Sequence, residues 1–383
     1  MEETEELNAL FMVWLKALIS LCYAYFIVSK LPKGKIRLFS LLPIFSLFTF
    51  LPLSLSTPTT TGLTGFFFTW NANFKLLQFA FNFGPLCDDL PRKSLFTFIL
   101  LAAFPIKIKQ NQKNPSGKTP KIDQKLPLNL WAKSLIYCLL VIAAFFSDYN
   151  KNLHPNVLWG IYCCFIYVNL EVVLGFNKKL IESILGVELC PPFDEPYLST
   201  SLQDFWGRRW NLMISDLLRH TIYLPVRAFW EIHLRKKWAP LPAVMASFLV
   251  SGLMHELLFY YIARASPTWE VTCFFLLHGV CVAVEIGLKR DLGLGRNWAL
   301  HWALAGPLTV GFVMATGLWL FLPQLVRSKV DERSLEEVKA VGARYPVVTS
   351  NPKFIDLDMC HFEPLYRVKH ELDIPLLLQT LSL

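Results

Sequence analysis

Apolar blocks of about 18–24 residues recur along the chain, and they constrain its fold more than any other feature. At 1.5 Å per helical residue, a block of about 20 residues crosses a hydrocarbon core of roughly 30 Å. Hydrophobic residues make up 54% of the 383 residues, while charged residues make up only 17%. The blocks are continuous rather than alternating, which argues against a membrane β-barrel. The sequence therefore predicts an all-α polytopic membrane protein.

Eight blocks are long enough to be predicted as transmembrane helices. They lie at 7–29, 38–55, 62–83, 130–147, 156–174, 240–263, 269–287 and 299–322. The third block is interrupted by Asn71, Asn73 and Lys75. A further block, 94–104, is too short to cross a bilayer, so we expect a re-entrant or interfacial helix there.

Lysine and arginine are distributed unevenly between the loops and predict the orientation of the chain. The 105–129 loop carries six lysines and the 175–239 loop carries nine lysines or arginines, whereas 148–155 and 264–268 hold almost no basic residues. We therefore expect the basic loops to face the cytosol. The net charge of +8 fits this topology better than nucleic-acid binding, which we do not expect. The acidic N-terminus does not resemble a signal peptide. With eight spans, we expect both termini on the side opposite the cytosol, which in a eukaryotic cell would be the lumen of the endoplasmic reticulum.

The membrane spans predict one domain and one tail. We expect residues 1–326 to form a single membrane-embedded domain, whose cytosolic amphipathic loop 175–239 contains the sequence DFWGRRWN. Residues 327–383 contain eight basic and nine acidic residues and no predicted span. This composition predicts a charged, poorly ordered C-terminal tail.

A histidine lies deep inside one predicted span, in the sequence SFLVSGLMHELLFYY at 247–261. His255 is about 22 Å from the start of that helix, where a polar group is costly unless it faces the bundle interior or a water-filled cavity. Ser251 lies one turn earlier, and Gly252 leaves room for a ligand or a neighbouring helix. Phe259 occupies the position at which a zinc protease needs its second histidine. The alternative interpretation is a histidine that only hydrogen-bonds across a helix interface.

The segment 202–230, just before this span, mixes tryptophans with arginines and suits a membrane–water interface. Arginine side chains there can hold phosphate groups, or they can simply anchor the segment at the interface. Asn211 closes the DFWGRRWN sequence with a neutral amide that both donates and accepts hydrogen bonds.

This pairing of a DFWGRRWN box with an intramembrane histidine in SFLVSGLMHE resembles the membrane-bound O-acyltransferase superfamily. The similarity is strongest to its plant wax synthase branch, also through SLLPIFSLFTFLPLSL at 40–55 and FFFTWNANFKLLQFAFNFGPL at 66–86. The resemblance implies an acyltransferase core with a central tunnel, a catalytic His255 with Asn211 as its companion, and acyl-CoA as co-substrate from the cytosol. Animal relatives carry a box closer to FYxDWWN, so Gly207, Arg208 and Arg209 depart from their pattern. We expect acyl-CoA to contact Trp206, Arg208, Arg209, Trp210 and Ser251.

The residues also favour a particular chemistry. No nucleophile elbow of the GxSxG type is present, so a covalent acyl-enzyme is not required. We expect direct transfer, in which His255 accepts the proton of an alcohol hydroxyl as that oxygen attacks the thioester. Asn211 is expected to stabilise the oxyanion or to hold the acyl-CoA. No metal and no cofactor beyond the acyl-CoA co-substrate is expected.

Several alternatives stay open. A long-chain fatty alcohol is the expected acceptor, but a sterol or a diacylglycerol, with acyl or acetyl transfer, fits the same family. A transporter would use intramembrane histidine and glutamate for ion passage, and a non-catalytic lipid-binding protein would share the fold. His278 and Glu285 share a helix face and either line the cavity or bond between helices. Glu171 is expected at the interface and Glu256 in contact with another helix; the bilayer is an expected partner, and no oligomeric state is indicated.

Overall fold

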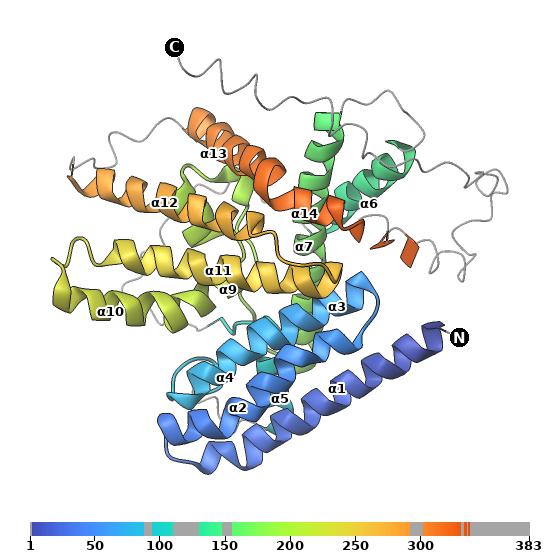
Figure 1. Cartoon of the computed structure of the whole chain (residues 1–383), viewed down its shortest axis with the longest axis vertical. Helices are drawn as coiled ribbons and strands as arrows, with labels where there is room; N and C mark the ends of the chain where they lie inside the picture. Colours follow the sequence, from blue (N-terminus) through green and yellow to red (C-terminus); the bar gives the residue numbers. More distant parts are fainter. Residues whose placement is uncertain are drawn as a thin grey trace. The chain divides into compact units, whose positions relative to one another are not determined.

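The computed structural model describes residues 2–87, 94–109, 130–147, 155–291, 302–330, 333–334 and 336–337. Within these ranges all the regular elements are helices, and the one β-type pairing is an isolated bridge between Ile108 and Leu189. The predicted all-α architecture is therefore confirmed for the described part of the chain (Figure 1).

The helices follow one another closely along the chain. The α-helices are α1 (Glu2–Phe26), α2 (Lys35–Phe50), α3 (Pro58–Thr64), α4 (Asn73–Ala80), α5 (Leu95–Ala103), α6 (Leu130–Ser147), α7 (Pro155–Leu185), α8 (Leu202–Asp204), α9 (Leu212–Leu218), α10 (Leu224–His233), α11 (Pro240–Ala263), α12 (Glu270–Asp291), α13 (Trp302–Thr316) and α14 (Leu322–Arg327). Short 3₁₀ turns are η1 (Val28–Lys30), η2 (Leu51–Ser54) and η4 (Pro196–Leu198). The π-helical segments in the described residues are η3 (Gly65–Ala72), η5 (Phe205–Arg209), η6 (Arg219–Tyr223) and η8 (Gly317–Phe321).

Six helices in the described residues are long and apolar enough to cross a membrane. They are Thr4–Lys30, Lys35–Ser54, Gly160–Leu185, Pro240–Ala263, Glu270–Asp291 and Ala303–Arg327. The chain is thus a multi-pass membrane protein, but the predicted number of eight spans is not confirmed. The other two predicted spans correspond to the continuous helix 58–80 and to α6.

The helix 58–80 contains buried polar side chains because it receives the end of the short helix α5. Asn71 donates hydrogen bonds to the carbonyl oxygens of Ala102 and Ala103, both at 3.1 Å. Lys75 donates to the carbonyls of Leu101 and Phe104, both at 2.7 Å. These carbonyls belong to the last turn of α5 and to Phe104, its C-cap residue, where no helical N–H remains to pair with them. Two of the three residues that interrupt the predicted span, Asn71 and Lys75, therefore stabilise the end of a helix that is too short to cross a bilayer.

The helix α7 runs past the predicted end of its span at residue 174. It continues to Leu185, and a partly buried ion pair between Lys178 and Glu182 at 2.8 Å supports the extra turns. Gly186 then ends the helix with φ of 66°, a left-handed conformation that suits glycine, while its N–H bonds the Glu182 carbonyl. The DFWGRRWN box follows in α8, η5 and the start of α9.

Helices α10, α11 and α12 lie side by side (Figure 1). Helices α11 and α12 approach each other closely at two glycines, one on each helix. A Cβ at Gly252 of α11 would lie 3.1 Å from the Thr272 backbone, and a Cβ at Gly279 of α12 would lie 2.9 Å from Phe248. Gly252 therefore makes room for the neighbouring helix, one of the two roles that the sequence left open.

Candidate active site

The imidazole of His255 is oriented by its own helix. Its Nδ1 lies 2.8 Å from the carbonyl oxygen of Ser251, one turn earlier on α11. A carbonyl oxygen can only accept, so Nδ1 carries the hydrogen that forms this bond. In the neutral ring the other nitrogen, Nε2, then has its lone pair free. Ser251 itself is buried, and its backbone rather than its hydroxyl makes this contact.

Aromatic rings from three other elements surround this half-buried imidazole. Phe275 of α12 stacks on it, with ring centroids 4.4 Å apart and planes inclined by 27°. Trp70 of η3 packs edge-to-face against it at 4.8 Å, and Phe321 of η8 lies at 5.8 Å. Such walls exclude water and strengthen the polar interactions that form between them.

Two of these three rings lie in π-helical segments, Trp70 in η3 and Phe321 in η8. Trp206 of the DFWGRRWN box lies in a third such segment, η5. A π-helical turn inserts one extra residue into a helix and redirects the side chains around it, and such turns occur frequently at functional sites. The pattern of apolar residues carries no signal for them.

Glu256 points away from the imidazole and serves the next helix. Its carboxylate accepts hydrogen bonds from the backbone N–H of Trp269 at 2.9 Å and from that of Thr272 at 3.2 Å. These groups lie at the N-terminus of α12, where N–H groups have no helical partner and negative charge is favourable. The expected contact of Glu256 with another helix is therefore confirmed.

The DFWGRRWN box is attached to α12 through Trp206. The indole Nε1 of Trp206 donates a hydrogen bond to Nδ1 of His278 at 3.1 Å. Nε2 of His278 in turn lies 2.9 Å from the hydroxyl of Thr316, which donates to the Phe312 carbonyl at 2.8 Å. Both ring nitrogens of the fully buried His278 are thus engaged between helices, as one of the two sequence interpretations had it.

A second attachment lies two helical turns further along α12. The carboxylate of Glu285 accepts a hydrogen bond from the backbone N–H of Gln203 at 3.0 Å and pairs with Lys289. Gln203 immediately precedes the box and lies three residues before Trp206, and His278 lies seven residues before Glu285 on α12. The shared face of His278 and Glu285 therefore holds the box rather than lining a cavity.

The two arginines of the box have different surroundings. Arg209 donates from Nε to the Asp204 carboxylate at 2.8 Å and from its terminal nitrogen to the carbonyls of Asp194 and Glu195, at 3.1 and 3.4 Å. Arg208 is exposed and makes no ion pair with the described residues. Of these two predicted contacts of acyl-CoA, only Arg208 has a guanidinium available for a phosphate.

The remaining tryptophan of the box belongs to an aromatic cluster. Trp210 stacks on Phe205 with centroids 5.3 Å apart and an interplanar angle of 17°, and it contacts Phe193, Tyr167 and Trp206. This cluster fixes the course of the chain immediately before Asn211.

Asn211 begins α9 in a left-handed conformation, with φ of 36°. Its Oδ1 accepts a hydrogen bond from the backbone N–H of Ile214 at 3.3 Å, so the amide caps the helix and its NH₂ group remains as a donor. No hydrogen bond joins Asn211 to His255 among the described residues. The two are linked indirectly, because Ile214 packs in one cluster with Trp70, whose ring contacts His255.

Comparisons with known proteins identify the family. Residues 189–277, which include the box and His255, match the sequence model of the membrane bound O-acyl transferase family. The chain is 46% identical to "Probable long-chain-alcohol O-fatty-acyltransferase 1" of Arabidopsis thaliana, over 87% of this chain and 95% of the relative. It is 43% identical to long-chain-alcohol O-fatty-acyltransferase of Simmondsia chinensis, over 91% and 96%. It is 39% identical to acyl-CoA–sterol O-acyltransferase 1 of Arabidopsis thaliana, over 86% and 94%.

The chain belongs to the membrane-bound O-acyltransferase family. The predicted similarity to its plant wax synthase branch is confirmed, and with it the prediction that the protein is an acyltransferase enzyme. Similarity over nearly the whole length leaves no support for the transporter alternative.

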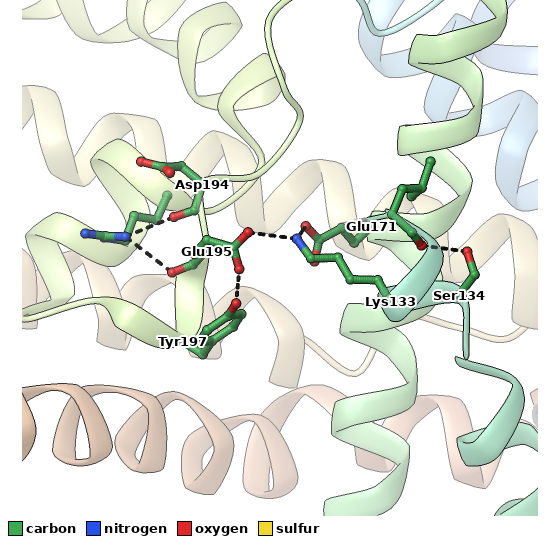
Figure 2. A network of polar contacts seen from close by, with 8 residues as sticks. Lys133, Ser134, Glu171, Asp194, Glu195 and Tyr197 are labelled. Atoms are coloured by element: carbon green, nitrogen blue, oxygen red, sulfur yellow. Dashed lines mark hydrogen bonds and ion pairs between the residues drawn. The ribbon is translucent and has the colours of Figure 1, made fainter. Parts of the chain in front are cut away.

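One buried charge network of this acyltransferase was missed by sequence reasoning (Figure 2). The Lys133 ammonium of α6 pairs with Glu171 of α7 and, at 2.9 Å, with Glu195 in the loop before the box. The side chains are only 11%, 8% and 12% exposed, and Tyr197 donates a further hydrogen bond to Glu195. Glu171 is therefore buried in an ion pair within the protein, and its place at the membrane interface stays a prediction. A lysine and a glutamate inside two apolar blocks were the available signal, since such groups rarely stay unpaired.

Proposed function

We propose that this protein transfers a fatty acyl group from acyl-CoA to the hydroxyl of a long-chain alcohol and forms a wax ester. The orientation of His255 is the observation that supports this chemistry best. Its Nδ1–H is bonded to the Ser251 carbonyl, which leaves Nε2 as a proton acceptor among aromatic walls. Two of the relatives described above are named for transfer to long-chain alcohols, which supports this acceptor over a sterol.

The reaction proceeds in one transfer. Nε2 of His255 accepts the hydroxyl proton while the alcohol oxygen attacks the carbonyl carbon of the thioester. The tetrahedral intermediate collapses as the carbon–sulfur bond breaks, and the CoA thiolate takes the proton back from Nε2. A thiolate is a good leaving group, so the step needs neither a metal nor a cofactor beyond acyl-CoA.

The membrane location suits the solubility of the substrates. The acyl chain, the alcohol and the ester product all partition into lipid, whereas the CoA nucleotide is polar. We place the nucleotide at the cytosolic face, where the exposed Arg208 can bind a phosphate. We further propose that a tunnel joins that face to His255. The NH₂ group of Asn211 is assigned to holding the acyl-CoA. We propose that the protein lies in the endoplasmic reticulum membrane of a plant cell, in keeping with relatives from Arabidopsis and Simmondsia.

The test uses microsomes from a yeast strain that makes no neutral lipid of its own. Radiolabelled acyl-CoA is supplied with hexadecanol, a sterol or a diacylglycerol, and esters are separated for wild type and His255→Ala. We expect wax ester from the wild type and a loss of at least about 10²-fold in His255→Ala, the usual contribution of a general base.

A matched control separates chemistry from folding. His220 has the same local geometry, with Nδ1 2.9 Å from the carbonyl of Asp216 one turn earlier, but it lies on η6. His220→Ala should retain most of the ester formation. Undiminished ester formation by His255→Ala would exclude His255 as the base. An ester formed only with the sterol would show that a sterol, and not the fatty alcohol, is the acceptor.

A further inference from the structure

The indole N–H of Trp70 is a buried donor without an acceptor. The side chain is only 2% exposed, and its Nε1 makes no hydrogen bond within the described residues. Buried N–H groups are paired in nearly all cases because an unpaired one loses its hydrogen bond to water without compensation. Tryptophan usually finds a partner when it is buried, so this orphan donor requires an explanation.

The position of the indole ring suggests an explanation. The ring of Trp70 lies edge-to-face against the imidazole of His255, with centroids 4.8 Å apart and planes at 84°. Among the buried polar side-chain atoms that lack a partner in the described residues, only the Trp70 nitrogen belongs to a ring in contact with His255. The neighbouring indole of Trp206 differs, because its N–H already bonds His278.

The indole is also held firmly. Phe66 packs edge-to-face against it at 6.1 Å, and Ile214 and Leu218 of the α9 region belong to the same buried cluster. Its π-helical segment η3 joins α3 and α4 in one continuous helix. A donor fixed by packing needs no reorganisation when charge develops beside it, which is what makes preorganised donors effective in catalysis.

We propose that Trp70 Nε1–H donates a hydrogen bond to the carbonyl oxygen of the acyl-CoA thioester and stabilises the oxyanion that forms there. This inference rests on the proposed function. As the alcohol oxygen bonds to the carbonyl carbon, His255 Nε2 takes the hydroxyl proton and the carbonyl π electrons move onto the oxygen that Trp70 holds. When the carbon–sulfur bond breaks, these electrons return to the carbonyl and the thiolate leaves with the proton from Nε2. Trp70 keeps its own proton throughout.

The carbonyl oxygen is a better target for this donor than the alcohol oxygen. A hydrogen bond to the alcohol oxygen would withdraw electron density from the attacking atom, lower its nucleophilicity and so slow the reaction. A hydrogen bond to the carbonyl oxygen withdraws electron density from the carbon that is attacked, and it strengthens as negative charge accumulates. Indole is a donor only, so it cannot compete with His255 for the proton.

The test compares Trp70→Phe with wild type in detergent-purified full-length protein, using two unreactive acyl-CoA analogues. In the ketone analogue a methylene replaces sulfur and the carbonyl stays; in the thioether analogue a methylene replaces the carbonyl and sulfur stays. We expect Trp70→Phe to weaken binding of the ketone about 3–10-fold and to leave the thioether unchanged. The kcat for ester formation should fall about 10²–10³-fold.

Trp14→Phe is the matched control, since Trp14 packs on Phe68 and Phe104 at 5.0 and 6.0 Å, away from His255. It should change neither the ratio of the two affinities nor kcat. The ratio is measured within one preparation, so a partly unfolded Trp70→Phe sample still gives it. Equal effects on both analogues, or no effect on either, would overturn the assignment. Because binding of the analogues requires no base, this result is independent of the outcome for His255→Ala.

Discussion

Trp206 donates a hydrogen bond from its indole Nε1 to Nδ1 of His278, and the two atoms lie 3.1 Å apart. This bond fixes the hydrogen of the neutral His278 ring on Nε2, which donates to Thr316 at 2.9 Å. In His255 the hydrogen lies on Nδ1 instead, bonded to the Ser251 carbonyl. Two histidines of neighbouring helices are thus held in opposite tautomers. Both nitrogens of His278 are hydrogen-bonded, whereas Nε2 of His255 has no hydrogen-bond partner among the described residues, and this difference separates a positioning role from a basic one.

The Thr316 hydroxyl should stabilise the fold because it accepts from a buried histidine. Thr316→Val leaves Nε2 of His278 without an acceptor, and we expect a loss of about 1–3 kcal/mol in the free energy of unfolding. Thr309 is the control, since it lies buried on the same helix and, within the part of the chain that the structure describes, bonds only the Ala305 carbonyl of its own helix at 2.7 Å. Thermal unfolding in detergent should give a clearly lower midpoint for Thr316→Val than for Thr309→Val. Equal midpoints would show that the contact with His278 contributes nothing.

Glu256 should act on stability through the N-terminus of α12. Glu256→Ala removes the acceptors of Trp269 and Thr272, and we expect the free energy of unfolding to fall by about 1–3 kcal/mol. Glu256→Gln keeps one side-chain acceptor and should lose about half as much. Chemical unfolding of the two variants checks this order. If Gln is as damaging as Ala, the negative charge rather than the capping geometry is what α12 requires.

The two arginines of the box should separate substrate binding from folding. Arg208→Ala should raise the KM for acyl-CoA about 2–5-fold at unchanged thermal stability, as expected for one exposed charge interaction of about 0.5–1 kcal/mol. Arg209→Ala should instead lower the unfolding temperature, because it breaks the bonds to Asp204 and to the backbone at 194–195. Steady-state kinetics and thermal unfolding on the same preparations test both. A KM effect confined to Arg209→Ala would reverse the assignment.

Lys133 should be essential for the buried network of Figure 2. Lys133→Met leaves Glu171 and Glu195 as buried, unpaired carboxylates, and we expect a loss of about 3–5 kcal/mol. Replacing both carboxylates by glutamine in the same variant should restore much of the stability, because no uncompensated charge then remains. Lys178→Met breaks a helix-surface pair with Glu182 and should have little effect. Expression level and unfolding midpoint of the three variants provide the measurement, and failure of the triple variant to recover would contradict the electrostatic explanation.

Patterns that repeat within one helix were predictable from the sequence. Continuous apolar blocks required membrane helices, and the cost of burying an imidazole singled out His255 before its neighbours were known. The positions of Ser251 and Glu256 relative to His255 also followed, because helical geometry alone sets which residues share a face. The box and its histidine were sufficient to indicate the family.

Contacts between distant segments were decided only by the tertiary structure. Trp70 reaches His255, and Lys133 reaches Glu195, across separations that no local periodicity spans. Trp70 and Trp206 lie in π-helical turns, and the apolar pattern carries no trace of these turns. Whether His255 or His278 keeps an unbonded ring nitrogen among the described residues depends on which hydrogen-bonding side chains the other helices place beside each ring. Local sequence therefore determined the helices and the candidate base. The partners of buried polar groups such as Lys133, Trp206 and His278 were decided by the fold, because each of these groups bonds a donor or acceptor that the packing of distant segments places beside it.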